Sequence, residues 1–156
     1  MSTDKLLKIL VFTSGMSVMA VEMTGLRLLD PYFGTSLIVT TILIGSMMGF
    51  LSLGYSWGGR LGDRSPKLES LARMTLIASI IVIALPFLAQ PILKVASSLL
   101  KPLLQGETIS EPMVALGTVG AGLIGTIALF AAPVTLMGTV SPWAIRLTVE
   151  DVESSG

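Results

Sequence analysis

A glutamate, an arginine and an aspartate stand close together in the otherwise apolar stretch MSVMAVEMTGLRLLDPYFGTS, residues 16–36. An ionisable side chain within a membrane helix is costly, so it usually faces the bundle interior or a wet cavity and marks a functional site. Glu22 is the candidate, because Gly15 and Gly25 share its helical face and predict a packed partner helix there. It could hold a proton or a cation, or anchor two helices through a hydrogen bond. The anchor is favoured because no second intramembrane acid follows that could relay a proton.

Arg27 and Asp30 indicate a structural role instead. Arg27 lies five residues beyond Glu22 and points in another direction on a helix, whereas Asp30 follows Arg27 by three residues. Opposite charges at that spacing are neighbours on a helix surface. We therefore predict an ion pair between Arg27 and Asp30, near the outer face of the membrane, that ends the first helix before Pro31.

The composition is that of a membrane protein. Hydrophobic residues make up 52% of the 156 residues and charged residues only 13%, about half the share usual in soluble domains. Ten basic side chains balance ten acidic ones, which predicts no nucleic-acid partner. The chain has neither cysteine nor histidine, the residues on which zinc sites and imidazole catalysis depend. We expect no metal site, no cofactor and no enzymatic activity.

Four segments are apolar enough to cross a bilayer, which takes about 20 residues each. The chain carries no charge from Ser36 to Gly59 or from Met74 to Leu93, and the uncharged run from Pro112 to Ile145 exceeds one span. We predict an all-α integral membrane protein, residues 1–156 forming a single transmembrane domain. Its membrane helices are expected at about 9–29, 37–58, 74–92 and 113–138.

The basic residues predict the orientation of these helices, because short cytoplasmic loops are rich in lysine and arginine. Segment 60–73 holds the densest basic cluster, Lys5 and Lys8 precede the first helix, and Arg146 follows the fourth. Four crossings bring all of them to one side. We expect a location in the inner (cytoplasmic) membrane, with both termini and the tail 146–156 in the cytoplasm.

The segment on the other side has a helical pattern of its own. Apolar residues recur at helical spacing through residues 92–104, and Lys94 and Lys101 take the opposite face. Such a pattern suits a short helix lying in the membrane interface, which Pro102 would limit or kink. A helical extension of the third span fits the pattern equally well.

Small residues recur at steps of three and four along two of the predicted helices, which lets helix backbones approach closely. In the second helix the main stripe is Gly45, Gly49, Ser52, Ser56 and Gly59, and Gly54 and Gly58 begin another. In the fourth helix the stripe begins with Gly117, Ala121 and Gly125. Static packing is the favoured interpretation, and a helix that slides against its neighbour is the alternative.

A longer stretch resembles a known family. The block VEMTGLRLLDPYFGTSLIVTTILIGSMMGFLSLGYSWGGRLGDRSP and the later LMGTVSPWAIRL are similar to the N-terminal membrane domain of the spermidine-synthase-like membrane proteins. These proteins are described as a major-facilitator-like membrane region fused to a spermidine synthase domain. The resemblance implies a major-facilitator-like partial bundle. Family members continue into a soluble aminopropyltransferase domain, and this sequence contains neither its glycine-rich nucleotide loop nor its paired aspartates.

The segment GGRLGDRSPK also resembles the major-facilitator loop between the second and third helices, where a glycine, an aspartate and basic residues form a gating cluster. Carried over, the resemblance assigns that cluster to Gly59, Asp63, Arg64 and Lys67. Pro66 departs from the pattern, because this position of the loop is usually glycine.

Together, the composition and the resemblance predict a non-catalytic subunit or anchor within a larger membrane assembly. Expected partners are the lipid bilayer and either other membrane subunits or further copies of the chain. Two alternatives stay open. One is a small polyamine or cation transporter in which Glu22 binds the substrate, and the other is a membrane anchor for a separately encoded aminopropyltransferase.

Overall fold

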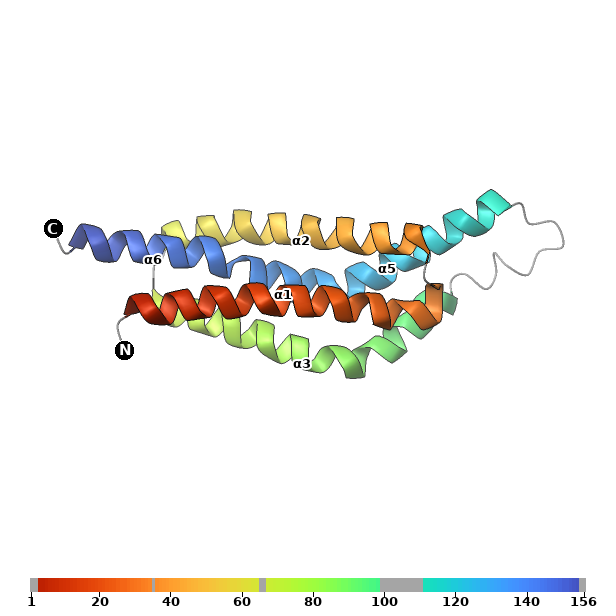
Figure 1. The fold of residues 1–156 in the computed structure, drawn as a ribbon, viewed down its shortest axis with the longest axis horizontal. Helices are drawn as coiled ribbons and strands as arrows, with labels where there is room; N and C mark the ends of the chain where they lie inside the picture. Colours follow the sequence, from red (N-terminus) through yellow and green to blue (C-terminus); the bar gives the residue numbers. More distant parts are fainter. Residues whose placement is uncertain (1–2, 35, 65–66, 99–110, 155–156) are drawn as a thin grey trace.

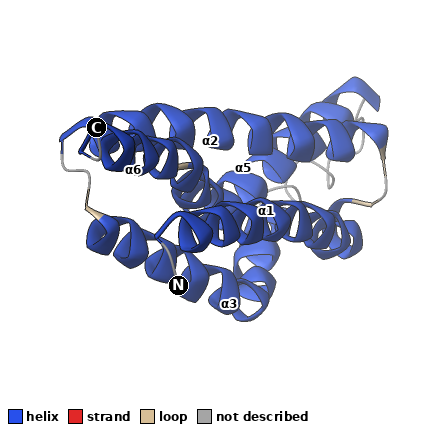
Figure 2. Ribbon diagram, turned by 60° about the vertical axis from the view of Figure 1, so that its left-hand side comes forward, coloured by secondary structure: helices blue, strands red, loops and turns tan. Residues whose placement is uncertain are grey.

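The computed structural model describes residues 3–34, 36–64, 67–98 and 111–154, and within these ranges it contains helices and no strand (Figure 1, Figure 2). The helices are α1 (Thr3–Phe33), α2 (Leu37–Arg64), α3 (Leu68–Ser98), α5 (Glu111–Gly138) and α6 (Val140–Ser154). Four helical segments are long and apolar enough to cross a membrane: Lys5–Phe33, Leu37–Arg64, Leu68–Ser98 and Pro112–Val149. The predicted all-α fold with four candidate membrane spans is confirmed.

Successive spans run in opposite directions, so the two ends of the chain lie at the same end of the bundle (Figure 1). The centre of the bundle is α5, which packs along α2 and α3, while α6 continues from α5 against the end of α2. In contrast, α1 touches all four other helices and packs extensively against none of them. The bundle is therefore a packed layer of α2, α5–α6 and α3, with α1 lying along it.

Two apolar clusters hold the helices together. The larger one joins α1, α2, α3 and α5 around the fully buried side chains of Leu29, Leu43, Leu93 and Phe130. The smaller cluster lies near the termini, where α1, α3 and α6 meet; its buried members are Leu7, Leu71, Val140, Trp143 and Ala144. α1 contributes to both clusters, but the middle of its outer face stays exposed.

A row of glycines brings α2 into backbone contact with the α5–α6 segment. A methyl group on Gly54 would overlap the carbonyl oxygen of Thr135, and one on Gly58 would lie 2.6 Å from the Cα of Thr139. Gly62 continues the row against Trp143 and Arg146. Because lipid supplies little hydrophobic drive between helices, close van der Waals contact of this kind is a main source of association. We call this contact the glycine seam.

Most helices extend beyond their predicted bounds, because hydropathy marks only the part of a helix that lies in hydrocarbon. The segment expected as the loop 60–73 consists largely of the end of α2 and the start of α3. The tail expected at 146–156 is instead helical as far as Ser154. The first part of segment 92–104 continues α3 to Ser98, in agreement with the alternative of an extended third span, and the rest lies outside the described residues.

α1 does not end before Pro31, as the sequence suggested, but continues through it to Phe33. The end is instead set by Gly34, whose φ of +75° is readily adopted only by glycine. Its N–H donates to the carbonyl oxygen of Asp30 over 2.8 Å, the hydrogen bond of a left-handed helix cap. Pro31 lacks an amide hydrogen, but the loss of one backbone hydrogen bond near the capped end of α1 does not end the helix.

Candidate functional site

The fourth span is broken where α5 meets α6. At the break, Thr139 N–H donates to the carbonyl oxygen of Leu136, only three residues back, over 3.2 Å. Pro142 has no amide hydrogen, so the carbonyl of Gly138 loses the donor that a regular helix would supply. Within a membrane, freed backbone groups are tolerated where they are buried in protein or line a cavity. The break is therefore a candidate binding site.

The backbone around the break is partly buried in protein and partly lines a cavity. On one side the glycine seam covers it, and on the other the hydroxyl of Ser14 in α1 donates to the carbonyl oxygen of Met137 over 3.3 Å. Beside that contact lies a cavity of about 190 Å³ between α1, α2 and the break. Its lining residues are Val11, Ser14, Gly15, Val18, Leu51, Tyr55, Met137, Gly138 and Ser141. Three of them carry hydroxyl groups that can donate or accept hydrogen bonds.

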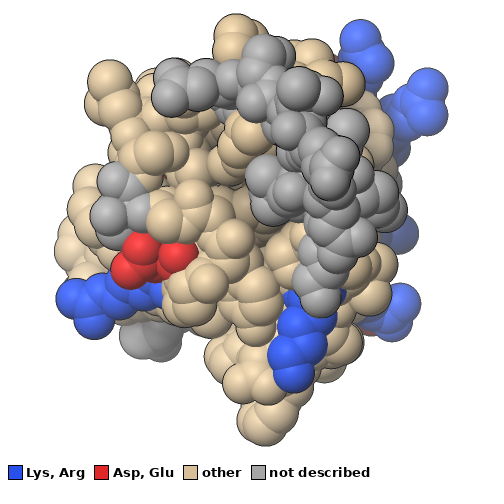
Figure 3. Space-filling view, turned by 90° about the vertical axis from the view of Figure 1, so that its right-hand side faces the viewer, with Lys and Arg blue, Asp and Glu red and all other residues tan. Residues whose placement is uncertain are grey.

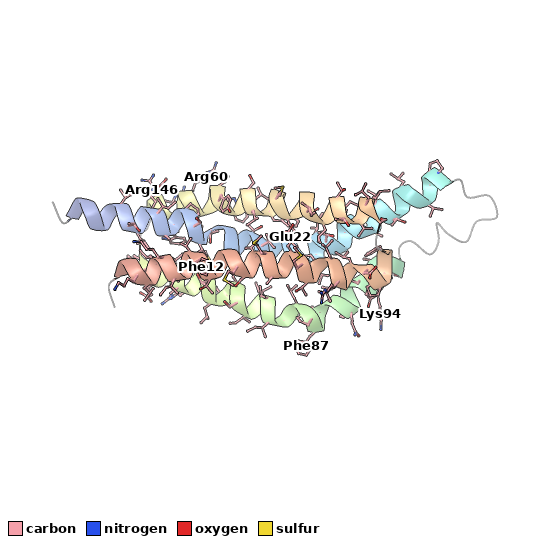
Figure 4. The ribbon with its side chains drawn as sticks, viewed as in Figure 1. Phe12, Glu22, Arg60, Phe87, Lys94 and Arg146 are labelled. Carbon is pink, nitrogen blue, oxygen red and sulfur yellow. The ribbon has the colours of Figure 1, made fainter. Side chains whose placement is uncertain are left out.

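Glu22 lies on the face of α1 that borders this cavity. Gly15 and Val18, which line the cavity, precede Glu22 by seven and four residues, so the three side-chain positions form one row along the helix. Figure 4 shows Glu22 in the middle part of α1. It is half-buried, and no hydrogen bond or ion pair to it is present among the described residues.

The two glycines that predicted a partner helix near Glu22 differ in their surroundings. Gly25 is buried, and a methyl group on it would lie 3.1 Å from the ring of Phe130 and 3.4 Å from Leu43. Gly15 has open space beside it because it lines the cavity. A helix therefore covers this face toward Gly25, while the part toward Gly15 opens into the cavity.

Two further cavities flank α1 on its other side, facing α3. One, of about 290 Å³, is lined by Thr13, Ser17, Thr75 and Ser79 among others, and the next, of about 280 Å³, shares Ser17. The four hydroxyls donate to carbonyl oxygens of their own helices rather than across the gap. Both flanks of α1 are consequently loosely filled.

The predicted ion pair between Arg27 and Asp30 is not formed. Both residues are exposed, and the two ion pairs present among the described residues involve other side chains. An exposed pair gains little energy, and holding two flexible side chains together costs entropy. The three-residue spacing allows Arg27 and Asp30 to approach each other, but forming the ion pair gains too little free energy.

Of the loop-motif residues, Gly59, Asp63 and Arg64 lie at the end of α2 and Lys67 directly precedes α3. One of them has a partner that the sequence analysis missed. The carboxylate of Asp63 lies 2.6 Å from the guanidinium of Arg146 on α6. Arg64 and Lys67 are exposed, and Gly59 has open space beside it. Asp63 thus links α2 to α6, a contact that could not be predicted while residues 146–156 were taken for a tail.

Some of the small residues in the two predicted stripes are buried against another helix, and others are exposed. Gly45 and Gly49 have nothing within 4 Å of an added methyl group, and Ser52 and Ser56 are exposed. Within this chain the seam is formed instead by the second row, Gly54 and Gly58, continued by Gly62. In α5, Gly117 is half-buried, Ala121 is buried, and a methyl group on Gly125 would lie 3.0 Å from Leu93.

Comparison of the chain with protein-family models, with curated proteins and with solved structures found no match. Among the described residues, no group of three or more acidic side chains is arranged to hold a metal ion. The candidate site is a carboxylate in the middle of α1, one turn beyond a cavity that lies beside the helix break and carries three hydroxyl groups. Chemically, it can bind a cation or donate and accept hydrogen bonds between helices.

Proposed function

We propose that this chain is a non-catalytic subunit or anchor of a larger assembly in the cytoplasmic membrane, in which its four spans form part of a major-facilitator-like bundle. The supporting observation is the outer face of α2, where Gly45, Gly49, Ser52 and Ser56 lie opposite the glycine seam. We call this row the outer stripe. It resembles the seam in residue type and spacing, and no helix among the described residues covers it.

Small residues on a lipid-facing surface contribute little, whereas in a helix interface they allow close backbone contact. The same helix shows the effect, since Gly54 and Gly58 make backbone contact with α5–α6. A helix from another subunit or a second copy would give the outer stripe an equivalent role. The aminopropyltransferase that the sequence resemblance implies is one candidate for a more distant partner in that assembly.

The test is crosslinking combined with mass measurement in mild detergent. Gly45→Cys should crosslink to a neighbouring chain, and native mass spectrometry should give a mass above that of one 16.4 kDa chain. Leu53→Cys is the matched control, because Leu53 is exposed on another face of α2. A monodisperse monomer in native membranes and detergent, with no crosslink from Gly45→Cys, would contradict the proposal.

A second function, cation or polyamine transport, is favoured by the site around Glu22. Transporters place their binding sites near the middle of the bilayer, at broken helices whose free carbonyl groups coordinate cations. Here the cavity lies beside the break between α5 and α6, and Glu22 follows the cavity-lining Val18 by one turn on the same face of α1. In this proposal α1 moves against the packed layer, and the carboxylate of Glu22 neutralises the cation.

Replacing Glu22 separates the two functions. Glu22→Gln keeps the shape and the hydrogen-bonding groups but removes the charge, so under the subunit proposal assembly and stability should change little. Under the transport proposal, uptake of a polyamine or monovalent cation into vesicles should be lost while the fold is kept. If wild-type vesicles show no uptake above empty ones, transport is rejected.

The orientation is part of the proposal and has its own test. Lys67, directly before α3, and Ser98, the last residue of α3, are both exposed. With both termini in the cytoplasm, a membrane-impermeant thiol reagent added outside should label Ser98→Cys and leave Lys67→Cys unlabelled in intact cells. The reverse labelling would show the opposite orientation.

A further inference from the structure

A third face of α2 differs from both the seam and the outer stripe. Leu53, Trp57, Arg60 and Arg64 follow one another at steps of four, three and four residues, so they form one row along the helix. All four are exposed, Leu53 by 51% and Trp57 by 54%. We call this row the Trp–Arg face. It combines a large aromatic side chain and two arginines without a neighbouring helix.

The length of α2 places this row at the boundary of the bilayer. The hydrocarbon core takes about 20 helical residues, and α2 begins at Leu37. Counted from there, the core ends near Trp57, and Arg60 and Arg64 lie at the level of the headgroups. Tryptophan is enriched at this level because its ring is apolar while its N–H is polar.

The described acidic side chains near this row pair with other arginines. Of the acidic side chains described at this end of the bundle, Asp63 pairs with Arg146 and Glu69 pairs with Arg73. No carboxylate lies within 4 Å of Arg60 or Arg64 among the side chains that the structure describes. Figure 4 shows Arg60 projecting from α2 away from the other helices. Seen from the opposite end of the bundle, the described surface is largely tan, with several basic groups toward its edges and an acidic group beside one of them (Figure 3).

Two arginines one turn apart repel each other unless an anion lies between them. Each guanidinium group can bind phosphate through two parallel hydrogen bonds. Below the arginines, Leu53 and Trp57 offer an apolar surface at the depth of the acyl chains. The row thus presents, in order of depth, groups suited to an acyl chain, to the glycerol region and to a phosphate.

We propose that the Trp–Arg face is a binding site for an anionic phospholipid, whose phosphate lies between Arg60 and Arg64 and whose acyl chain lies along Trp57 and Leu53. The site belongs to the leaflet at the end of the bundle that holds both termini. It goes beyond the proposed function, because it involves a face of α2 that neither assembly through the outer stripe nor transport at Glu22 uses.

The experiment measures the apparent affinity of the purified chain for phosphatidylglycerol by native mass spectrometry, with phosphatidylcholine as the neutral lipid. The wild type should retain phosphatidylglycerol in preference. A basic residue near an anionic membrane surface contributes enough to change affinity about fivefold, so Arg60→Gln combined with Arg64→Gln should weaken binding about 25-fold. Trp57→Leu should weaken both lipids, because it removes the interfacial ring and no charge.

Lys5→Gln combined with Lys8→Gln is the matched control, since it removes two exposed charges from the same end of the bundle. It should leave the affinity for phosphatidylglycerol close to that of the wild type. An equal loss in both double variants would show diffuse attraction by charge and would overturn the site. Displacement of the lipid by inorganic phosphate at similar concentration would assign the arginines to a free anion instead, and would also overturn it.

Discussion

The glycine seam and the flanks of α1 are packed in opposite ways. Along the seam, α2 and the α5–α6 segment meet backbone to backbone, and Gly54 and Gly58 leave no room even for a methyl group. Along α1, by contrast, three cavities separate the helix from its neighbours. The seam uses residues without side chains, whereas α1 carries serine and threonine hydroxyls that mostly bond within their own helix.

This difference indicates which parts of the bundle can move relative to one another. Elements with few buried contacts open at the lowest free energy, whereas closely packed elements open only with the whole fold. We therefore expect α2, α5–α6 and α3 to move as one body and α1 to be the element held least firmly. Glu22 lies on α1, beside the body that carries the helix break, so the candidate site is located where the two kinds of packing meet.

The largest expected effect comes from breaking the seam. Gly58→Leu forces a side chain against Thr139 and Pro142, which lie 2.6 Å and 2.8 Å from the position of the first added carbon. Overpacking of a close contact costs about 3 kcal/mol or more when backbone has to move. Thermal unfolding in detergent, followed by circular dichroism, should show a large loss of stability.

Gly49→Leu is the control for this substitution, because it adds the same side chain to the same helix. Gly49 has open space beside it, and leucine has the higher helix propensity, by about 0.5–1 kcal/mol. The stability of an isolated chain should therefore stay the same or rise slightly. Equal losses at Gly49 and Gly58 would show that close backbone contact along the seam does not stabilise the bundle.

The seam also shows where sequence reasoning succeeds and where it stops. Four spans followed from the long apolar runs of the sequence, because each run is long enough to cross a bilayer as a helix. The sequence did not show which of the two glycine rows on α2 faces the other helices, since Gly45 and Gly54 begin rows of the same spacing. Which row faces inward depends on α5, a neighbour distant in the sequence. For the same reason, Glu22 could be identified by its type, whereas the cavity and the helix break beside it could not.

The contact between α2 and α6 at the end of the seam should have an intermediate effect. Asp63 and Arg146 are 2.6 Å apart but about half exposed, so water and salt screen them. Such pairs contribute about 0.2–1 kcal/mol. A double-mutant cycle with Asp63→Asn and Arg146→Gln should give a coupling energy in this range that falls as salt is added. A coupling as large as the Gly58→Leu effect would show that charge, rather than close packing, holds α6 to α2.

The smallest effect is expected where α1 reaches across to the packed layer. The Ser14 hydroxyl donates to the carbonyl of Met137 over 3.3 Å, a long hydrogen bond between the loosely held helix and the break. Hydrogen bonds between membrane helices average about 0.6 kcal/mol, so Ser14→Ala should destabilise the protein by no more than that. Ser17→Ala is the matched control, because the Ser17 hydroxyl bonds to Thr13 within α1. In hydrogen exchange, Ser14→Ala should increase the exchange of α1 amides more than Ser17→Ala does, while the exchange of α2 and α5 stays unchanged. If exchange rises equally in α1 and in the packed layer, the two regions unfold as one unit, and the division of the bundle into a firm body and a loose helix fails.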